Sequence, residues 1–439
     1  MTCFIGSIFC CLLIVAIGKQ TVTDKDGIAV DIRANLTTLI HVHAMWRHGD
    51  RTPIILLPND AANDEESWEI GLGELTVDGI WQAYHLGKFL RQRYDGFLNE
   101  TFKTSEIYVR STDINRTLMT ANAVLQGLYP QTYHNDKLSS SVWHPIPVHT
   151  VRAEDDKQLL QQDCPRVKEE LQQVLKTEAI QDMLKLNEKF LRYIGKHMNV
   201  KSGYFNLENI WLVYDSLKVI TYHKDKHQFP NWVNETVWNK ISEMYNLWGQ
   251  YQYNTDLLKR LQGGELWKEI FARLNDLMTE HSVWKQKMYA YSAHDDTLAV
   301  LLNMFGIELT TYPPYTALIL LETHWIDNQF ILQLYYKNVT DSNQIYRFQI
   351  AYCDDICTVE KLETATSQFI PLNWEMECDP FVLYKKMSTA ILLISMISIV
   401  AIISCQILKS HLRKRKVYSD RMVLPSDADM ALLREDVTR

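Results

Sequence analysis

The sequence predicts an α/β protein in which a central sheet is flanked by helices, carries an inserted helical lobe and is followed by one transmembrane helix. Three observations predict this fold. Strand, turn and helix patterns alternate near both ends of the main body. Helical periodicity dominates about residues 155–280, and an uncharged apolar run covers residues 387–408. We therefore expect the α/β core at about residues 38–154 and 281–380, with the lobe inserted between them.

The first part of the core alternates between strands and helices. The expected elements are a strand over Leu39–Trp46, a helix with Thr76 as N-cap that runs to about Arg93, a strand over Glu106–Val109, and a helix over Asp113–Leu128. Gly49 and Pro53 end the first strand and predict a turn after it.

The middle of the chain reads as helices, and the sheet then resumes. The expected helices are Arg166–Lys176, Ala179–Met198, Leu207–Tyr222, Val233–Tyr251 and Leu257–Glu280. The expected later elements are a strand over Lys287–Ser292, a helix through Phe305, and hairpin strands over Leu318–Glu322 and Phe330–Tyr336.

The two ends predict a membrane protein with its body outside the cytosol. Residues 1–19 have the short apolar core of a signal peptide, although no basic residue precedes it. Residues 387–408 can span a bilayer, and the basic cluster that follows places the tail, residues 409–439, in the cytosol. The luminal or extracellular domain then covers residues 20–384. The Leu432-Leu433 pair resembles a dileucine sorting signal, so we expect either the lysosome or the cell surface.

Cysteines and glycosylation sequons agree with this topology. Four cysteines fall outside the signal and the span, and they allow three disulfide pairings. The short separation favours Cys353–Cys357, which leaves Cys164–Cys378; a zinc site is the alternative, but no histidine pair accompanies it. We expect N-glycosylation at Asn35, Asn99, Asn234 and Asn338. Asn115 also begins a sequon, but it lies in an expected helix.

The turn after the first strand carries the strongest chemical signal. Arg47-His48-Gly49-Asp50-Arg51 places a histidine between two arginines, an arrangement that suits a bound dianion such as phosphate. The net charge is −8 and no basic stripe appears outside the tail, which argues against nucleic-acid binding.

Two further strand ends carry polar residues, namely Arg110 and His294-Asp295. In an α/β sheet the carboxyl ends of strands converge on one crevice. The chain resembles the histidine acid phosphatases, branch 2 of the histidine phosphatase superfamily. The segments that carry the resemblance are residues 47–53, Glu74-Leu-Thr with Gly79 and Gln82, residues 109–113 with Arg116-Thr117, and residues 292–295.

The resemblance implies a phosphoglycerate-mutase-like sheet and an acid phosphatase that works through a phosphohistidine. His48 would be the nucleophile and Asp295 the proton donor. Arg47, Arg51, Arg110 and His294 would bind the phosphate. A free aspartic acid, with a pKa of about 3.9, is protonated far more at pH 5 than at pH 7, which favours an acidic compartment. We expect no cofactor, no catalytic metal and a small phosphomonoester substrate. The resemblance also raises a homodimer, although no sequence feature identifies an interface.

Two other functions compete with this interpretation. A binding module that kept the fold would have lost a site residue, and all six are present. A metal-dependent hydrolase could use His41 and His43, which share a strand face, but no acidic partner follows at metal-binding spacing. We expect these histidines to pack in the core, and Asp296 to be an N-terminal helix charge.

Overall fold

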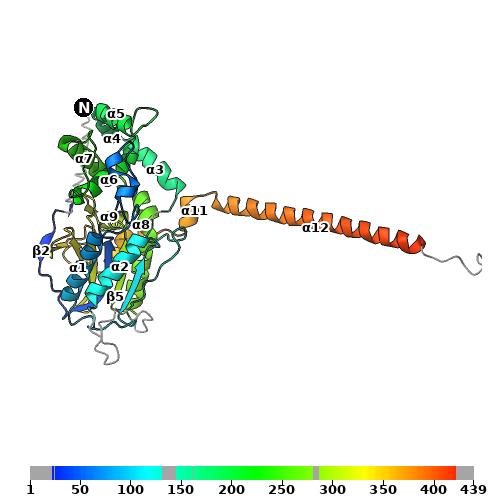
Figure 1. The fold of residues 1–439 in the computed structure, drawn as a ribbon. Coiled ribbons are helices and arrows are strands. Elements are labelled where there is room, and N and C mark those ends of the chain that lie inside the picture. Colours follow the sequence, from blue (N-terminus) through cyan, green and yellow to red (C-terminus); the bar gives the residue numbers. More distant parts are fainter. Residues whose placement is uncertain (1–21, 24, 131–144, 161, 280–285, 422–439) are drawn as a thin grey trace, which may run out of the picture. The chain divides into compact units, whose positions relative to one another are not determined.

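A computed structural model describes residues 22–23, 25–130, 145–160, 162–279 and 286–421. The chain forms two compact units, Met1–Cys378 and Asp379–Arg439, which are described separately (Figure 1). The signal peptide expected at residues 1–19 and the Leu432-Leu433 pair lie outside the described residues.

Within the described residues the main sheet of the first unit has seven strands in the order β2-β9-β8-β7-β3-β5-β4. The strands are β1 (Val22–Thr23), β2 (Ile28–Val30), β3 (Leu39–Arg47), β4 (Ile107–Ser111), β5 (Met288–Ala293), β6 (Ile307–Glu308), β7 (Leu318–Ile326), β8 (Gln329–Lys337) and β9 (Ile345–Phe348). β3, β5 and β4 are parallel, whereas β7, β8, β9 and β2 continue the sheet in antiparallel pairs. β1 and β6 form a separate parallel pair. The mixed α/β class predicted from the sequence is thus confirmed.

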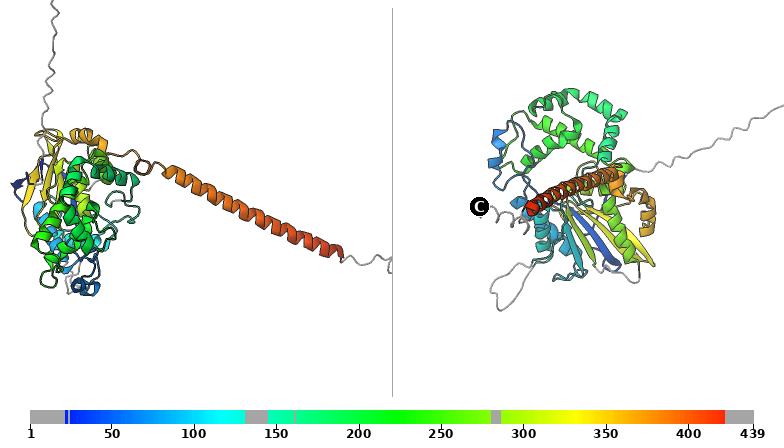
Figure 2. Two further views of the ribbon diagram at one scale, coloured as in Figure 1. Left: turned by 90° about the horizontal axis from the view of Figure 1, so that it is seen from above. Right: turned by 90° about the vertical axis from the view of Figure 1, so that its right-hand side faces the viewer.

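Helices cover both faces of the sheet and form the lobe. The α-helices are α1 (Val77–Arg93), α2 (Asn115–Leu128), α3 (Pro165–Leu175), α4 (Glu178–Leu186), α5 (Glu188–His197), α6 (Ile210–Tyr222), α7 (Glu235–Tyr251), α8 (Asp256–Leu277), α9 (Asp295–Met304), α10 (Val359–Thr366) and α11 (Trp374–Cys378). The 3-10 turns are η1 (Ala61–Asn63), η2 (Glu65–Ser67), η3 (Leu207–Asn209) and η4 (Ser367–Phe369). Figures 1 and 2 show helices α4 to α7 gathered at one end of the unit, away from α1 and α2.

The alternation of β3 explains the two-sided core. Val42, Ala44 and Trp46 are fully buried in the cluster that contains the apolar faces of α1 and α2. Met45 points to the other face, into the cluster built by α8 and α9. Strand side chains alternate between faces, so a central strand must be apolar on both. α1 and α2 pack closely because Gly87 leaves room: a Cβ there would lie 2.0 Å from the Val124 carbonyl oxygen.

The lobe has a core of its own. Its buried side chains come from α4 to α7 and include Ile180, Leu191, Ile210, Val213 and Ile241. The single helix expected over Ala179–Met198 is wrong, because α4 ends at Leu186 and α5 begins at Glu188. Asn187 lies between them and donates its side-chain amide to the Met183 carbonyl, 2.8 Å away. That bond competes with continued helix formation.

Disulfides link Cys164 to Cys378 and Cys353 to Cys357. The first joins the start of α3 to the end of α11. In the second unit, α12 (Val382–Arg421) contains a stretch, Met387–Lys416, whose most apolar 18-residue window has a mean hydropathy of 2.6. By length and composition this helix can cross a membrane.

Candidate active site

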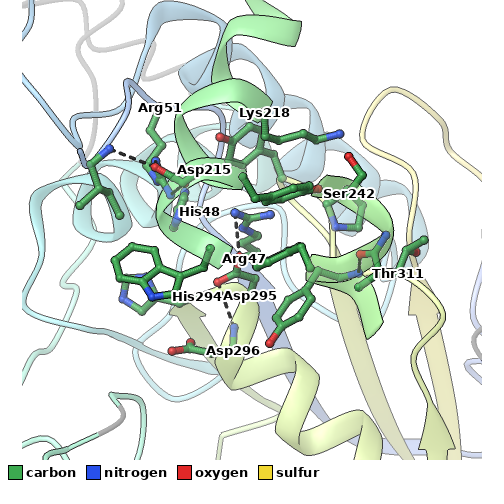
Figure 3. A pocket seen from close by; sticks show the side chains of 18 of the residues that line it. Arg47, His48, Arg51, Asp215, Lys218, Ser242, His294, Asp295, Asp296 and Thr311 are labelled. Atoms are coloured by element: carbon green, nitrogen blue, oxygen red, sulfur yellow. Dashed lines mark hydrogen bonds and ion pairs between the residues drawn. The ribbon is translucent and has the colours of Figure 1, made fainter. Parts of the chain in front are cut away.

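The polar strand ends meet in one cavity (Figure 3). Arg47 of β3 pairs with Ala293 of β5, so the carboxyl ends of these parallel strands lie at the same edge of the sheet. A cavity of about 880 Å³ lies at this edge. Five of the six residues expected to act on phosphate line it, namely Arg47, His48, Arg51, His294 and Asp295.

The turn that carries His48 is held by its backbone. The His48 N–H donates to the Ala293 carbonyl at 3.0 Å, which ties the turn to β5. The Asp50 N–H donates to Gln82 Oε1 at 2.8 Å. Gly49 presses against α1: a Cβ at this position would lie 2.3 Å from the Gly79 carbonyl oxygen. Only glycine allows this approach, so the turn rests directly on the first turn of the helix.

The contacts and the surroundings of the His48 ring favour its neutral form. Its Nδ1 lies 2.8 Å from the Gly49 carbonyl oxygen, which can only accept a hydrogen bond. Nδ1 therefore carries the proton, and Nε2 keeps its lone pair. Burial, followed by the charges of Arg116, Arg47 and Arg51, holds the pKa of His48 well below its usual range. The ring thus stays neutral even in mildly acidic solution.

Arg47 connects the turn to the carboxylate at the start of α9. Its Nη2 lies 2.9 Å from Asp295 Oδ2, and its Nη1 donates to the Pro313 carbonyl at 2.7 Å. The guanidinium also lies over the Tyr315 ring, 4.5 Å from the centroid. These contacts fix the fork of Arg47 beside His48, where it can bind an anion bidentately.

Arg51 is oriented by a residue that the sequence analysis missed. Asp215 of α6 accepts from both terminal nitrogens of Arg51, at 2.5 and 3.2 Å, and from the Ile54 N–H at 3.1 Å. Asp215 therefore ties the helical lobe to the turn that carries His48 and Arg51. No sequence motif marks it, because its partner is 164 residues away.

The expectation that Arg110 binds phosphate is wrong. Arg110 pairs with Asp156 at 2.6 Å and with Glu269 at 3.4 Å, and it lines a different cavity, beside α8. Strand alternation explains this placement: Ile107 and Val109 of β4 face α1 and α2, so Arg110 faces the opposite side. Arg110 is a structural residue that neutralises buried carboxylates.

Arg116 takes the position expected for Arg110. It lies in the first turn of α2, lines the cavity and is half-buried. Burial and the charge of Arg51 lower its pKa to about 10. Its residue pair, Arg116-Thr117, was part of the recognised motif, and its place just beyond a strand end was the signal that could have identified it.

His294 completes the cationic and polar rim. Its Nε2 lies 3.0 Å from Thr112 Oγ1, which in turn contacts Thr117 Oγ1 at 2.6 Å. Burial, with the charges of Arg116, Arg47 and Arg51, holds its pKa well below the usual range. A bound dianion would offset those charges and allow His294 to donate a second hydrogen bond.

His41 and His43 lie on β3, in the interior of the protein. Both rings are buried and pack against Tyr289, with centroid separations of 5.5 and 5.8 Å. His41 Nδ1 contacts the Gln286 carbonyl oxygen. Among the described residues, no group of three or more histidine, cysteine or acidic side chains has metal-binding geometry.

Comparison with known sequences places this site in a family context. The model of the histidine phosphatase superfamily (branch 2) matches residues 56–337. Putative acid phosphatase 5 of Caenorhabditis elegans is 36% identical over 92% of this chain and 93% of that protein. Human prostatic acid phosphatase is 34% identical over 77% of this chain and 87% of its own length. Human lysosomal acid phosphatase is 32% identical over 78% of this chain and 80% of its own length.

Solved structures show the same fold at lower identity. A phytase from Citrobacter braakii has a TM-score of 0.59 at 15% identity, over 78% of this chain and 99% of that one. Hafnia alvei phytase in complex with tartrate has a TM-score of 0.57 at 16% identity, over 76% of this chain and 98% of that one.

Proposed function

The chain belongs to branch 2 of the histidine phosphatase superfamily and is an acid phosphatase, and from this premise we propose that it hydrolyses phosphate monoesters through a phosphohistidine on His48. The observation that carries the proposal is the neutral His48 ring, with Nε2 free, inside a group of three arginines. A neutral imidazole can attack phosphorus, and the surrounding cations stabilise the charge on the transferred group.

The first step forms the bond between His48 Nε2 and phosphorus and breaks the bond from phosphorus to the ester oxygen. Arg47, Arg51 and Arg116 hold the phosphoryl oxygens, with His294 as a further donor. Asp295 gives its proton to the departing alkoxide. In the second step Asp295 takes a proton from water, the water oxygen bonds to phosphorus, and the bond to Nε2 breaks to release phosphate.

This division of roles accounts for acid activity. His48 must be neutral and Asp295 protonated. The low pKa of His48 keeps the nucleophile neutral as the pH falls, and carboxylic acids in general become better proton donors in the same direction. The two requirements therefore overlap in acidic solution, where an ordinary histidine would already be protonated.

The walls of the cavity favour small esters with a single phosphate group. Beyond the three arginines, Lys218 is the one lysine among the described lining residues, and Asp215 and Asp296 add negative charge. The remaining walls are rich in aromatic side chains: Trp211, Tyr214, Tyr222, Trp238, Tyr245, Trp248, Tyr253 and Tyr312. Such walls suit one phosphate group on an apolar or aromatic alcohol better than a polyphosphate.

The two disulfides and the C-terminal apolar helix support a single-pass protein with its catalytic unit outside the cytosol. We propose residence in the lysosomal or the cell-surface membrane, with N-glycans on Asn35, Asn99, Asn234 and Asn338. The similarity to lysosomal acid phosphatase supports the first location. Asn115 is a poor acceptor, because its side-chain amide donates to Glu74 Oε1 at 2.9 Å.

The test uses the full chain in detergent with the substitution His48→Ala. We expect hydrolysis of p-nitrophenyl phosphate at pH 5 to fall to background and acid-labile phosphate on the protein to disappear after a rapid quench. His85→Ala is the matched control, because His85 is exposed on α1 and lies outside the active-site cavity. Unchanged hydrolysis by His48→Ala would refute the phosphohistidine.

A further inference from the structure

A second carboxyl group stands beside the proposed proton donor. Asp295 and Asp296 are the first two residues of α9, and both line the cavity that contains His48 (Figure 3). Asp296 does accept the Thr297 N–H at 2.7 Å, as an N-terminal helix charge would. That role alone does not require a carboxylate in the active-site cavity, so Asp296 calls for a further explanation.

The two carboxylates have unequal partners. Asp295 pairs with Arg47 through Oδ2 and accepts the Asp296 N–H through Oδ1, at 3.0 Å. Among the described residues, Asp296 accepts hydrogen bonds from Thr297 alone, through its N–H and, at 3.3 Å, its hydroxyl. None of the ion pairs found in the described part of the chain includes Asp296. Because Arg47 favours ionised Asp295, a proton shared by the pair resides on Asp296 in the free enzyme.

The groups around Asp296 reinforce this asymmetry. Burial and then the charge of Asp295 raise the pKa of Asp296 to about 6, against the opposing effects of the Thr297 bonds and of Arg116. Tyr312, on the facing segment, lies close enough to be influenced by both carboxylates. At acidic pH the pair therefore holds one proton in the interior of the site, within reach of the reacting phosphate.

We propose that Asp296 is a positioning residue that acts on the proton donor, Asp295. In the free enzyme Asp296 stores the proton of the pair. Once phosphate has drawn Arg47 away, the charge of Asp296 keeps that proton on Asp295. This rests on the proposed function of Asp295. When the dianion binds, the proton moves from Asp296 to Asp295, the carboxyl that contacts Arg47, and Asp296 is left ionised. The O–H bond of Asp295 then breaks as the O–H bond of the leaving alcohol forms. Water later returns a proton to Asp295, and the departure of phosphate restores the starting state.

The test compares two leaving groups, measured as kcat/KM, which reports the first chemical step. β-Glycerophosphate releases an alkoxide that needs a proton, whereas p-nitrophenyl phosphate releases a stable phenolate. In Asp296→Asn we expect kcat/KM for β-glycerophosphate to fall at least about tenfold. The basic limb of its pH profile should move down by about one pH unit, because a tenfold change corresponds to one unit. The direction follows because asparagine has neither a proton to store nor a negative charge that would hold a proton on the neighbouring carboxyl. The p-nitrophenyl value should change less than about threefold.

Two further variants make the outcome decisive. Asp296→Ser keeps an oxygen for the Thr297 N–H and should give the same result if the carboxyl, rather than the cap, matters. Asp341→Asn removes the same charge from a separate cavity and should change neither value. An equal loss on both substrates, or no loss on either, overturns the role of Asp296. Because His48→Ala tests the phosphohistidine separately, an inactive His48→Ala beside an unchanged Asp296→Asn would refute this inference alone.

Discussion

Arg110 and Arg116 give the sharpest test of the site. The same substitution should lower the activity but not the stability at Arg116, and the stability but not the activity at Arg110. In Arg116→Gln we expect kcat/KM to fall about a hundredfold to a thousandfold, the cost of removing one preorganised donor to a transition-state oxygen. The fold should keep its stability within about 1 kcal/mol, since no ion pair in the described residues holds Arg116. Its one hydrogen bond in the described residues is a long contact, at 3.5 Å, with the Gly73 carbonyl oxygen.

Arg110→Gln should show the reverse. The substitution leaves Asp156, whose side chain is 0% exposed, without its cation. Removing one partner of a buried ion pair costs about 3–5 kcal/mol of folding free energy. The molecules that fold should retain kcat/KM, since Arg110 does not reach the phosphate cavity.

The assays are urea unfolding followed by fluorescence and steady-state hydrolysis of p-nitrophenyl phosphate across pH. The charge of Arg116 also depresses the pKa of His48. In Arg116→Gln that pKa should rise, so His48 becomes protonated at a higher pH and the acid limb moves upward. An Arg110→Gln enzyme that is stable but inactive, or an Arg116→Gln enzyme with full activity, would refute the assignment.

Three other results follow from the contacts. Asp215→Asn removes the charge that orients Arg51, so the inhibition constant for inorganic phosphate should rise about tenfold, a loss of about 1.4 kcal/mol; an unchanged constant would remove Asp215 from the site. Buried Glu322 of β7 accepts hydrogen bonds from Arg93 Nε and Tyr94 Oη, both at 2.7 Å. Arg93→Met should therefore lower the free energy of unfolding in urea by about 3–5 kcal/mol and preserve kcat/KM. An unchanged free energy of unfolding would contradict this account. Replacing Cys164 and Cys378 together with serine should cost about 2–5 kcal/mol, and equal stability would show that the lobe is held by other contacts.

The sequence predicted best those elements whose pattern comes from local burial. β3, β5 and the β7–β8 hairpin lie within a few residues of their expected positions, because central strands must be apolar and turn residues bound them. β2 and β9 were missed. Both are short, and β2 at the edge of the sheet pairs with β9 from the other end of the catalytic unit's sequence, so this pairing depends on a contact far away in the chain.

The site residues divide in the same way. Arg47, His48, Arg51, His294 and Asp295 follow directly from strand ends, and topology brings them together. The prediction for Arg110 was wrong because a motif does not say to which side of the strand a residue points. The alternation set by Ile107 and Val109 does give that side. Asp215 could not be predicted, since it reaches the turn from another lobe and its role appears only when α6 is placed over Arg51.

The charge balance of the site links its architecture to its acidity. Arg47 and Arg51 are held by Asp295 and Asp215, whereas Arg116 has no such partner in the described residues, so the cavity carries excess positive charge close to His48 and His294. Burial and, after it, this positive charge keep both imidazoles neutral at a pH where they would otherwise be protonated. A bound phosphate dianion offsets this positive charge, which allows His294 to donate a further hydrogen bond to it. Binding of the substrate therefore adds the conditions for proton donation to a site that is already suited to nucleophilic attack by His48.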